Sequence, residues 1–267
     1  MKRKLVRWLI VVLLVYVIGG VLLYLFQEKL IFHPEPLPPD YRYSFDAPFK
    51  EINLAINKEK NLSIVQFIVP DSVCKGVVLY FHGNRKNILR YADYASNFTK
   101  NNYEVWMIDY PGFGKSTGER TEQILYDDAL RLYKMARVRF SPDSIIIYGK
   151  SIGTGIACQL ASVLDCRHLI LETPFYSGHA LAKHFFPIYP VALMQYDFPS
   201  NVYAEKITAP VTIFHGTNDE LIPYPQAKKL LKKFKTEKEL VTIEKGKHND
   251  LNAFRLFHQK LDSLLNL

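Results

Sequence analysis

The sequence predicts an α/β fold in which helices cover both faces of a mostly parallel sheet, preceded by one membrane-spanning helix. Short, uninterrupted apolar runs alternate with longer stretches of helical periodicity, which is typical of strands buried on both faces and of the helices that cover them. A run of 19 residues without a charge lies close to the N-terminus and is long enough to cross a bilayer. Hydrophobic residues make up 48% of the 267 residues, which excludes an intrinsically disordered chain.

The charge-free run occupies residues 8–26, and four of the seven residues before it are Lys or Arg. As a helix it would span about 28 Å, close to the thickness of the hydrocarbon core. A cleaved signal peptide is the alternative, but its apolar stretch is shorter, and this run ends at Leu25 and Phe26 instead of small residues. We expect residues 1–26 to form an uncleaved signal anchor. The positive-inside rule then predicts a cytoplasmic N-terminus and a domain on the outer (periplasmic, extracellular or lumenal) side.

The segment after this anchor, residues 27–50, contains five of the 15 prolines. Proline fixes φ and lacks an amide hydrogen, so we expect an extended connector here and not a helix. Its aromatic residues have two possible environments, the lipid headgroups and the surface of the domain, and the sequence does not choose between them. The remainder, residues 51–267, is expected to be one doubly wound domain.

Within this domain, seven apolar runs are expected to be strands, and five periodic stretches to be helices. The strands are expected at residues 62–69, 76–81, 104–109, 144–148, 167–171, 211–214 and 240–244. The helices are expected at residues 87–100, 121–138, 152–164, 225–234 and 250–264.

The interval at about 172–209 is longer than connectors in compact domains usually are, and it is rich in aromatic residues and proline. We interpret it as a small cap over a pocket that is apolar enough to hold an acyl chain. The pocket residues predicted from it are Phe175, Tyr176, Phe185 and Phe186. A pair of helices that only adds to the core is the alternative.

The candidate nucleophile is Ser151, in Gly149-Lys150-Ser151-Ile152-Gly153, which follows one expected strand directly and opens the next helix. This context is what a G-x-S-x-G elbow requires, because the tight turn leaves no room for side chains at the glycine positions and exposes the serine hydroxyl. Residues 114–118 match the same pattern around Ser116. They lie several residues beyond a strand and before the next helix, so we expect them to form a loop.

A serine hydroxyl becomes a good nucleophile when a base takes its proton and an acid orients the base. His248 is the best-placed base, in a loop between the last strand and the last helix. Asp219 follows the preceding strand, and the chain order Ser151, Asp219, His248 is that of elbow hydrolases. Two alternatives remain: Asp219 only caps the turn after it, or Glu172 supplies the acid from the end of another strand.

The developing oxyanion needs hydrogen-bond donors. His82-Gly83-Asn84 directly follows an expected strand, and a glycine there lets the backbone turn its N–H groups toward the elbow. We assign the donors as the backbone N–H groups of Asn84 and Ile152. His82 is expected to hold this loop by hydrogen bonding and not to transfer protons.

Charge and cysteine content exclude other classes. The net charge is +8, but four of these charges precede the apolar run, which leaves too few for a nucleic-acid groove. Three cysteines form neither a disulfide scaffold nor a CxxC pair for zinc or redox chemistry, so we expect no metal. Lysines at residues 228–235 are expected to be a solvated helix face, with anionic lipid headgroups as the alternative partner.

The segments that carry a family resemblance are His82-Gly83-Asn84, 109–116, the elbow at Ser151, 172–175, His215-Gly216 with Asp219, and 246–248. Together they resemble the α/β-hydrolase superfamily and, within it, the membrane-anchored alpha/beta-hydrolase-domain serine hydrolases. The resemblance covers roughly residues 60–265 and implies an eight-stranded core, a Ser151–His248–Asp219 triad and no cofactor. Arg85 and Lys86 depart from the small residues usual after His-Gly-Asn, which puts the substrate in question and not the triad.

These observations predict a membrane-anchored serine hydrolase that cleaves carboxylic ester or thioester bonds through an acyl-enzyme on Ser151. The aromatic cap and the tether favour a small-molecule or lipid-derived acyl substrate. Peptide or amide cleavage by the same triad is the alternative within enzymes. A catalytically inactive scaffold that presents its cap to a membrane partner is the alternative outside them. The sequence leaves the oligomeric state open.

Overall fold

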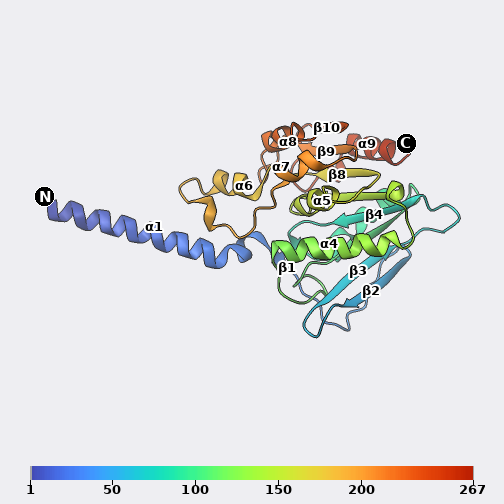
Figure 1. Ribbon diagram of the computed structural model, residues 1–267, viewed down its shortest axis with the longest axis horizontal. Helices are drawn as coiled ribbons and strands as arrows, with labels where there is room; N and C mark the ends of the chain where they lie inside the picture. The colour runs from blue at the N-terminus through green and yellow to red at the C-terminus, as the bar shows by residue number, and fades with distance from the viewer. Residues whose placement is uncertain (1, 267) are drawn as a thin grey trace.

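An eight-stranded sheet of order β10-β9-β8-β7-β4-β6-β3-β2 forms the centre of the structure, a computed structural model that describes residues 2–266 (Figure 1). Strands β10 to β6 pair in parallel, whereas β3 is antiparallel to both of its neighbours. The strands of this sheet are β2 (Phe49–Ala55), β3 (Asn61–Phe67), β4 (Gly76–Phe81), β6 (Tyr103–Ile108), β7 (Ile145–Lys150), β8 (His168–Glu172), β9 (Val211–Gly216) and β10 (Lys238–Ile243). The α-helices are α1 (Lys2–Ile31), α2 (Ile88–Tyr91), α3 (Ser96–Thr99), α4 (Glu122–Arg137), α5 (Gly153–Ala161), α6 (Gly178–Phe185), α7 (Ser200–Tyr203), α8 (Tyr224–Leu231) and α9 (Arg255–Leu265).

The central strands are buried on both faces, and their residues alternate between two apolar cores. On β4, Val77 and Leu79 face one core, and Val78 and Tyr80 face the other. Helices α4, α5 and α8 close the first core, and α2, α3 and α9 close the second. This three-layer arrangement confirms the predicted fold class.

All seven expected strands are present, with ends that differ by no more than two residues from those predicted. The eighth, β2, was not predicted because its residues alternate between half-buried and exposed positions and form no apolar run. The helix expected at 87–100 is instead two short helices, α2 and α3, joined by a 3₁₀ turn at Ala92–Ala95. Another 3₁₀ turn, Leu251–Ala253, replaces the first residues of the helix expected at 250–264.

Helix α1 is long and apolar enough to cross a membrane and extends beyond the predicted anchor. The expectation of an extended connector from residue 27 was wrong at its start, because α1 continues to Ile31. Residues 27–31 are compatible with a helix, and the first proline after them is Pro34, which lies beyond the helix end.

The connector after α1 is held against the domain. His33–Pro34 form strand β1, which pairs in parallel with β5 (Arg85–Lys86), and Pro36 bridges to Gly114. The connector aromatics that the sequence left unplaced pack on the domain: Tyr43 is buried, and the rings of Phe45 and Phe67 lie 5.1 Å apart. The end of α1 is therefore tied to the loop that follows β4.

A pH-dependent loss of stability is expected from His168 on β8. Its Nε2 lies 2.9 Å from Thr212 Oγ1, and burial lowers the pKa of His168 to about 4. The folded state therefore prefers neutral histidine, while the unfolded chain takes up a proton near pH 6.5. The stabilisation is complete above pH 6.5 and is lost as the pH falls toward 4, by up to about 3 kcal/mol.

Urea unfolding of the full chain in detergent at pH 7 and pH 4.5 measures this effect. His168→Gln should flatten the pH dependence of the free energy of unfolding. The matched control is His184→Gln, at an exposed histidine on α6, which should follow the wild type. Parallel losses in the wild type and His168→Gln would show that acid acts elsewhere.

Candidate active site

Ser151 lies in the tight turn between β7 and α5, and its φ of 53° is in the left-handed region. The flanking glycines allow this turn because other backbone passes very close to them. A Cβ on Gly153 would lie 2.1 Å from the carbonyl oxygen of Phe81, and one on Gly149 would lie 2.5 Å from that of Gly153. The backbone N–H of Ser151 donates to the carbonyl of Glu172, 2.9 Å away, so β8 also fixes the turn.

The second G-x-S-x-G match has a different environment. Ser116 is buried in a loop after β6, where its hydroxyl donates to the carbonyl of Asp109 at 2.6 Å and accepts from the N–H of Ser63 at 2.8 Å. Its neighbour Lys115 forms an ion pair with Glu51. Ser116 therefore joins this loop to β3, and the structure places no histidine against its hydroxyl among the described residues.

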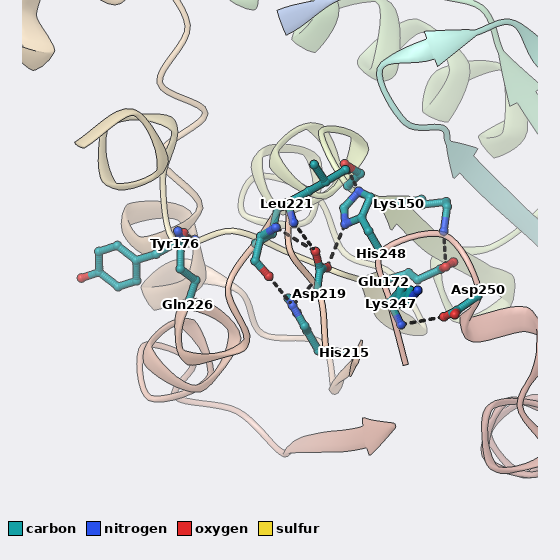
Figure 2. Close-up of polar contacts among 12 residues, drawn as sticks. Lys150, Glu172, Tyr176, His215, Asp219, Leu221, Gln226, Lys247, His248 and Asp250 are labelled. Carbon is teal, nitrogen blue, oxygen red and sulfur yellow. Dashed lines mark hydrogen bonds and ion pairs between the residues drawn. The ribbon is translucent and has the colours of Figure 1, made fainter. Parts of the chain in front are cut away.

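The structure brings together the three side chains that the sequence selected. His248 Nε2 lies 2.9 Å from Ser151 Oγ, and His248 Nδ1 lies 2.8 Å from Asp219 Oδ2. Asp219 comes from the loop after β9 and His248 from the loop after β10. All three residues therefore follow the carboxyl ends of parallel strands in the same half of the sheet. Figure 2 shows the imidazole of His248 pointing at the carboxylate of Asp219.

The carboxylate of Asp219 is fixed by more than His248. Oδ1 accepts from the backbone N–H groups of Leu221 at 2.9 Å and Ile222 at 2.8 Å. Asp219 therefore both caps this turn and contacts His248. Oδ2 also lies 3.4 Å from Nε2 of the buried His215 (Figure 2). Burial raises the pKa of Asp219, but hydrogen bonds from His215 and His248 outweigh it and hold that pKa well below its usual range.

The contact between His215 and Asp219 was not foreseen as part of the site. His215 is the second-last residue of β9 and lies only four residues before Asp219. Its Nε2 lies 2.9 Å from the carbonyl of Ile222. The available sequence signal was its position in His215-Gly216 at the end of a buried strand.

Glu172, the other candidate acid, is engaged elsewhere. Its buried carboxylate accepts hydrogen bonds from Lys150 Nζ and from the hydroxyl of Tyr148, as Figure 2 shows for Lys150. The ion pair between Lys150 and Glu172 lies next to the elbow in the chain, because Lys150 directly precedes Ser151. Removal of one partner from such a buried pair would leave an uncompensated charge. The carboxylate in contact with His248 is that of Asp219.

The loop His82-Gly83-Asn84 passes close to the elbow, since a Cβ on Gly83 would lie 3.7 Å from Ser151 Cβ. Across residues 2–266, the backbone N–H groups of Asn84 and Ile152 donate no hydrogen bond to another protein group. The side-chain amide of Asn84 donates to the carbonyl of Ile31. The backbone carbonyl of Asn84 accepts from the N–H of His33 at 2.8 Å. The last residue of α1 and the first residue of β1 thus hold this loop.

His82 is wholly buried beneath the same loop. Its Nδ1 lies 2.7 Å from the carbonyl of Gly83, and its Nε2 lies 3.2 Å from Asp109 Oδ1. The following residues, Arg85 and Lys86, are exposed and form the β5 strand that pairs with β1.

The four predicted pocket residues lie in three different surroundings. Phe175 is buried in the core against Phe198, with ring centroids 6.4 Å apart. Tyr176 is half-buried, and the ammonium of Lys229 lies 4.1 Å from its ring centroid. Phe185 and Phe186 are 48% and 43% exposed at the end of α6. Their joint assignment to one substrate pocket stays a prediction.

The sheet, the elbow and the hydrogen-bonded serine, histidine and aspartate define the class: this is an α/β-hydrolase of the serine type. The family model described as "Serine aminopeptidase, S33" matches residues 72–197. An esterase of Pyrococcus furiosus superposes with a TM-score of 0.67 over 88% of this chain and 97% of that chain; at 16% identity it shares the fold.

Sequence similarity to two curated relatives shows the family within this class. Alpha/beta hydrolase domain-containing protein 17C of Xenopus tropicalis is 32% identical over 192 residues, 71% of this chain and 61% of the relative. Human alpha/beta hydrolase domain-containing protein 17B is 31% identical over 195 residues, 72% of this chain and 67% of the relative. The chain belongs to the family of these alpha/beta hydrolase domain-containing proteins. It spans about three fifths of the length of the first relative.

Proposed function

We propose that this chain is a membrane-anchored hydrolase that cleaves carboxylic ester or thioester bonds through an acyl-enzyme on Ser151. The observation that carries the proposal is the continuous hydrogen-bonded series from Ser151 Oγ through His248 to Asp219, with contacts of 2.9 and 2.8 Å. These are the distances and roles that a serine nucleophile, its general base and an orienting acid require.

In the first half-reaction, His248 Nε2 takes the proton of the Ser151 hydroxyl as Oγ attacks the acyl carbon. Asp219 stabilises the imidazolium that forms. The N–H groups of Asn84 and Ile152 donate to the oxyanion, each contributing about 2.7–4 kcal/mol to transition-state stabilisation. His248 then gives its proton to the departing alcohol or thiol, which leaves the acyl group on Ser151. Water, deprotonated by the same imidazole, releases the acid and restores Ser151.

Helix α1 supports the membrane part of the proposal, because it is long, apolar and only slightly covered by the rest of the chain. The cationic residues before its apolar stretch favour a cytoplasmic N-terminus, with the catalytic domain on the outer side. A hydrolase held at the bilayer surface has direct access to lipid-derived acyl groups.

A substrate panel tests the reaction class. The purified full chain in detergent is assayed with p-nitrophenyl esters, acyl thioesters and aminoacyl anilides, with Ser151→Ala as the blank. We expect turnover of esters and thioesters above that of anilides. Preferential anilide cleavage would favour the peptidase alternative, which the name of the matching family model supports. A folded chain that cleaves none of them and resists a fluorophosphonate probe would contradict the proposal in favour of an inactive scaffold.

A further inference from the structure

The cap contacts α1 within the apolar stretch of that helix. The rings of Tyr16 and Tyr189 stack with centroids 5.0 Å apart, and the Tyr16 hydroxyl donates to the carbonyl of Ile188 at 3.0 Å. Gly19 makes this approach possible, since a Cβ there would lie 2.1 Å from the Tyr189 hydroxyl. In Figure 1 the cap projects from the domain along the side of α1.

A second set of contacts fixes how far along α1 the cap lies. Gln27 is buried, and its Nε2 donates to the carbonyl of Leu193 at 3.1 Å, while its Oε1 accepts from the N–H of Gln195 at 2.7 Å. One residue further, Glu28 accepts from the hydroxyl of Tyr196. Polar contacts at both ends of the shared surface determine one register between cap and helix.

This register places the cap loop at a definite depth. Tyr16 lies ten residues before Phe26, the last residue of the charge-free run, or about 15 Å along the helix axis. The hydrocarbon core is about 30 Å thick, so the contact between Tyr16 and residues 188–189 lies near its middle when α1 spans it.

The loop has the composition of a lipid-facing surface. Phe185, Phe186 and Ile188 are 48%, 43% and 68% exposed, although nothing in their own chemistry favours contact with water. Lys183 and His184, which directly precede these residues on α6, are also exposed and are the polar end of this surface.

Most N–H groups of the loop backbone are paired or absent, which a hydrocarbon environment favours. The exception is the N–H of Ile188, which donates to no group among residues 2–266. Phe186 N–H donates to the carbonyl of Ala182 at 2.7 Å, and Tyr189 N–H donates to that of Phe186 at 3.1 Å. Pro187 and Pro190 have no N–H to satisfy. The carbonyl of Ile188 is the acceptor for Tyr16.

We propose that residues 185–189 are immersed in the hydrocarbon layer beside α1, so that the partner of this apolar surface is the acyl-chain region of the bilayer that α1 crosses. This inference rests on the membrane anchoring in the proposed function. Its consequence is that the cap contacts lipid directly.

Fluorescence quenching of the full chain in phosphatidylcholine vesicles tests the inference. Single cysteines are introduced into a Cys74→Ser background, since Cys158 and Cys166 are buried, and are labelled with nitrobenzoxadiazole. The variants are Ile188→Cys in the loop, Leu13→Cys in α1 and Val138→Cys after α4. Val138 is 89% exposed and remote from the cap, which makes it the matched aqueous control.

We expect lipids with a nitroxide on the acyl chain to quench most of the fluorescence at positions 188 and 13, and aqueous iodide to quench only position 138. Iodide quenching at 188 with lipid quenching at 13 would overturn the loop inference and leave the anchor intact. Iodide quenching at both would contradict the anchor as well. Shielding of 188 from both quenchers would show that a protein surface covers the loop, which also overturns the inference.

Discussion

Ser151→Ala is expected to lower kcat by about 10⁶-fold, because it removes Oγ, the proposed nucleophile of the hydrogen-bonded series. The residual rate would come from the oxyanion donors and substrate binding alone. Hydrolysis of a short-chain p-nitrophenyl ester by the full chain measures the loss, and fluorophosphonate labelling should disappear with it.

Ser116→Ala is the matched control for this prediction, since both serines occupy the same sequence pattern. Within residues 2–266, the Ser116 hydroxyl bonds only to backbone groups of Asp109 and Ser63. Its removal should lower the free energy of unfolding by about 1 kcal/mol and leave kcat near that of the wild type. Equal losses of kcat in both variants would be incompatible with the assignment of Ser151 as nucleophile.

Asp219→Asn is expected to lower kcat by about 10⁴-fold with little change in KM. An amide in place of the carboxylate no longer stabilises the imidazolium and favours the wrong tautomer of His248. The amide oxygen can still accept from the N–H groups of Leu221 and Ile222, which should preserve the turn. Steady-state kinetics together with a thermal melt separate the catalytic effect from any loss of folded protein.

Glu172→Gln supplies the contrast, because it tests the other carboxylate that the sequence offered. This change leaves Lys150 with an uncompensated buried charge, which costs about 3–5 kcal/mol of stability. At temperatures where the variant is folded, its kcat should fall far less than that of Asp219→Asn. A larger fall in kcat for Glu172→Gln would instead assign the catalytic acid to Glu172.

Much of the fold could be predicted from the sequence because the central strands are buried on both faces and read as uninterrupted apolar runs. Edge strand β2 lacked that signal, because its side chains alternate between half-buried and exposed positions. The residues Ser151, Asp219 and His248 could be selected because each lies at or in the loop after the carboxyl end of a strand, and parallel strands end at a common edge.

The unpredicted contacts depend on tertiary structure. The pairing of Glu172 with Lys150 requires β7 and β8 to be neighbours, and the pairing of Gln27 with Gln195 joins residues 168 positions apart. No local sequence pattern distinguishes two charges that form a buried ion pair from two charges on the surface. Nor does the sequence of an apolar helix show whether another segment of the chain packs against it. The break between α2 and α3 was not predicted either, because the periodicity of apolar residues does not determine where a helix ends.

The hydrogen bond from Asn84 to the last turn of α1, together with the His33 N–H bond to Asn84, has a practical consequence for biochemistry. Enzymes with a single N-terminal anchor are often cut just after it to ease purification. Here a cut after residue 31 would remove the carbonyl of Ile31, which accepts a hydrogen bond from the Asn84 side chain. It would also leave β1 at a free chain end. Rates measured on such a trimmed protein would describe an enzyme in which the loop proposed to bind the oxyanion has lost its hydrogen bond to Ile31.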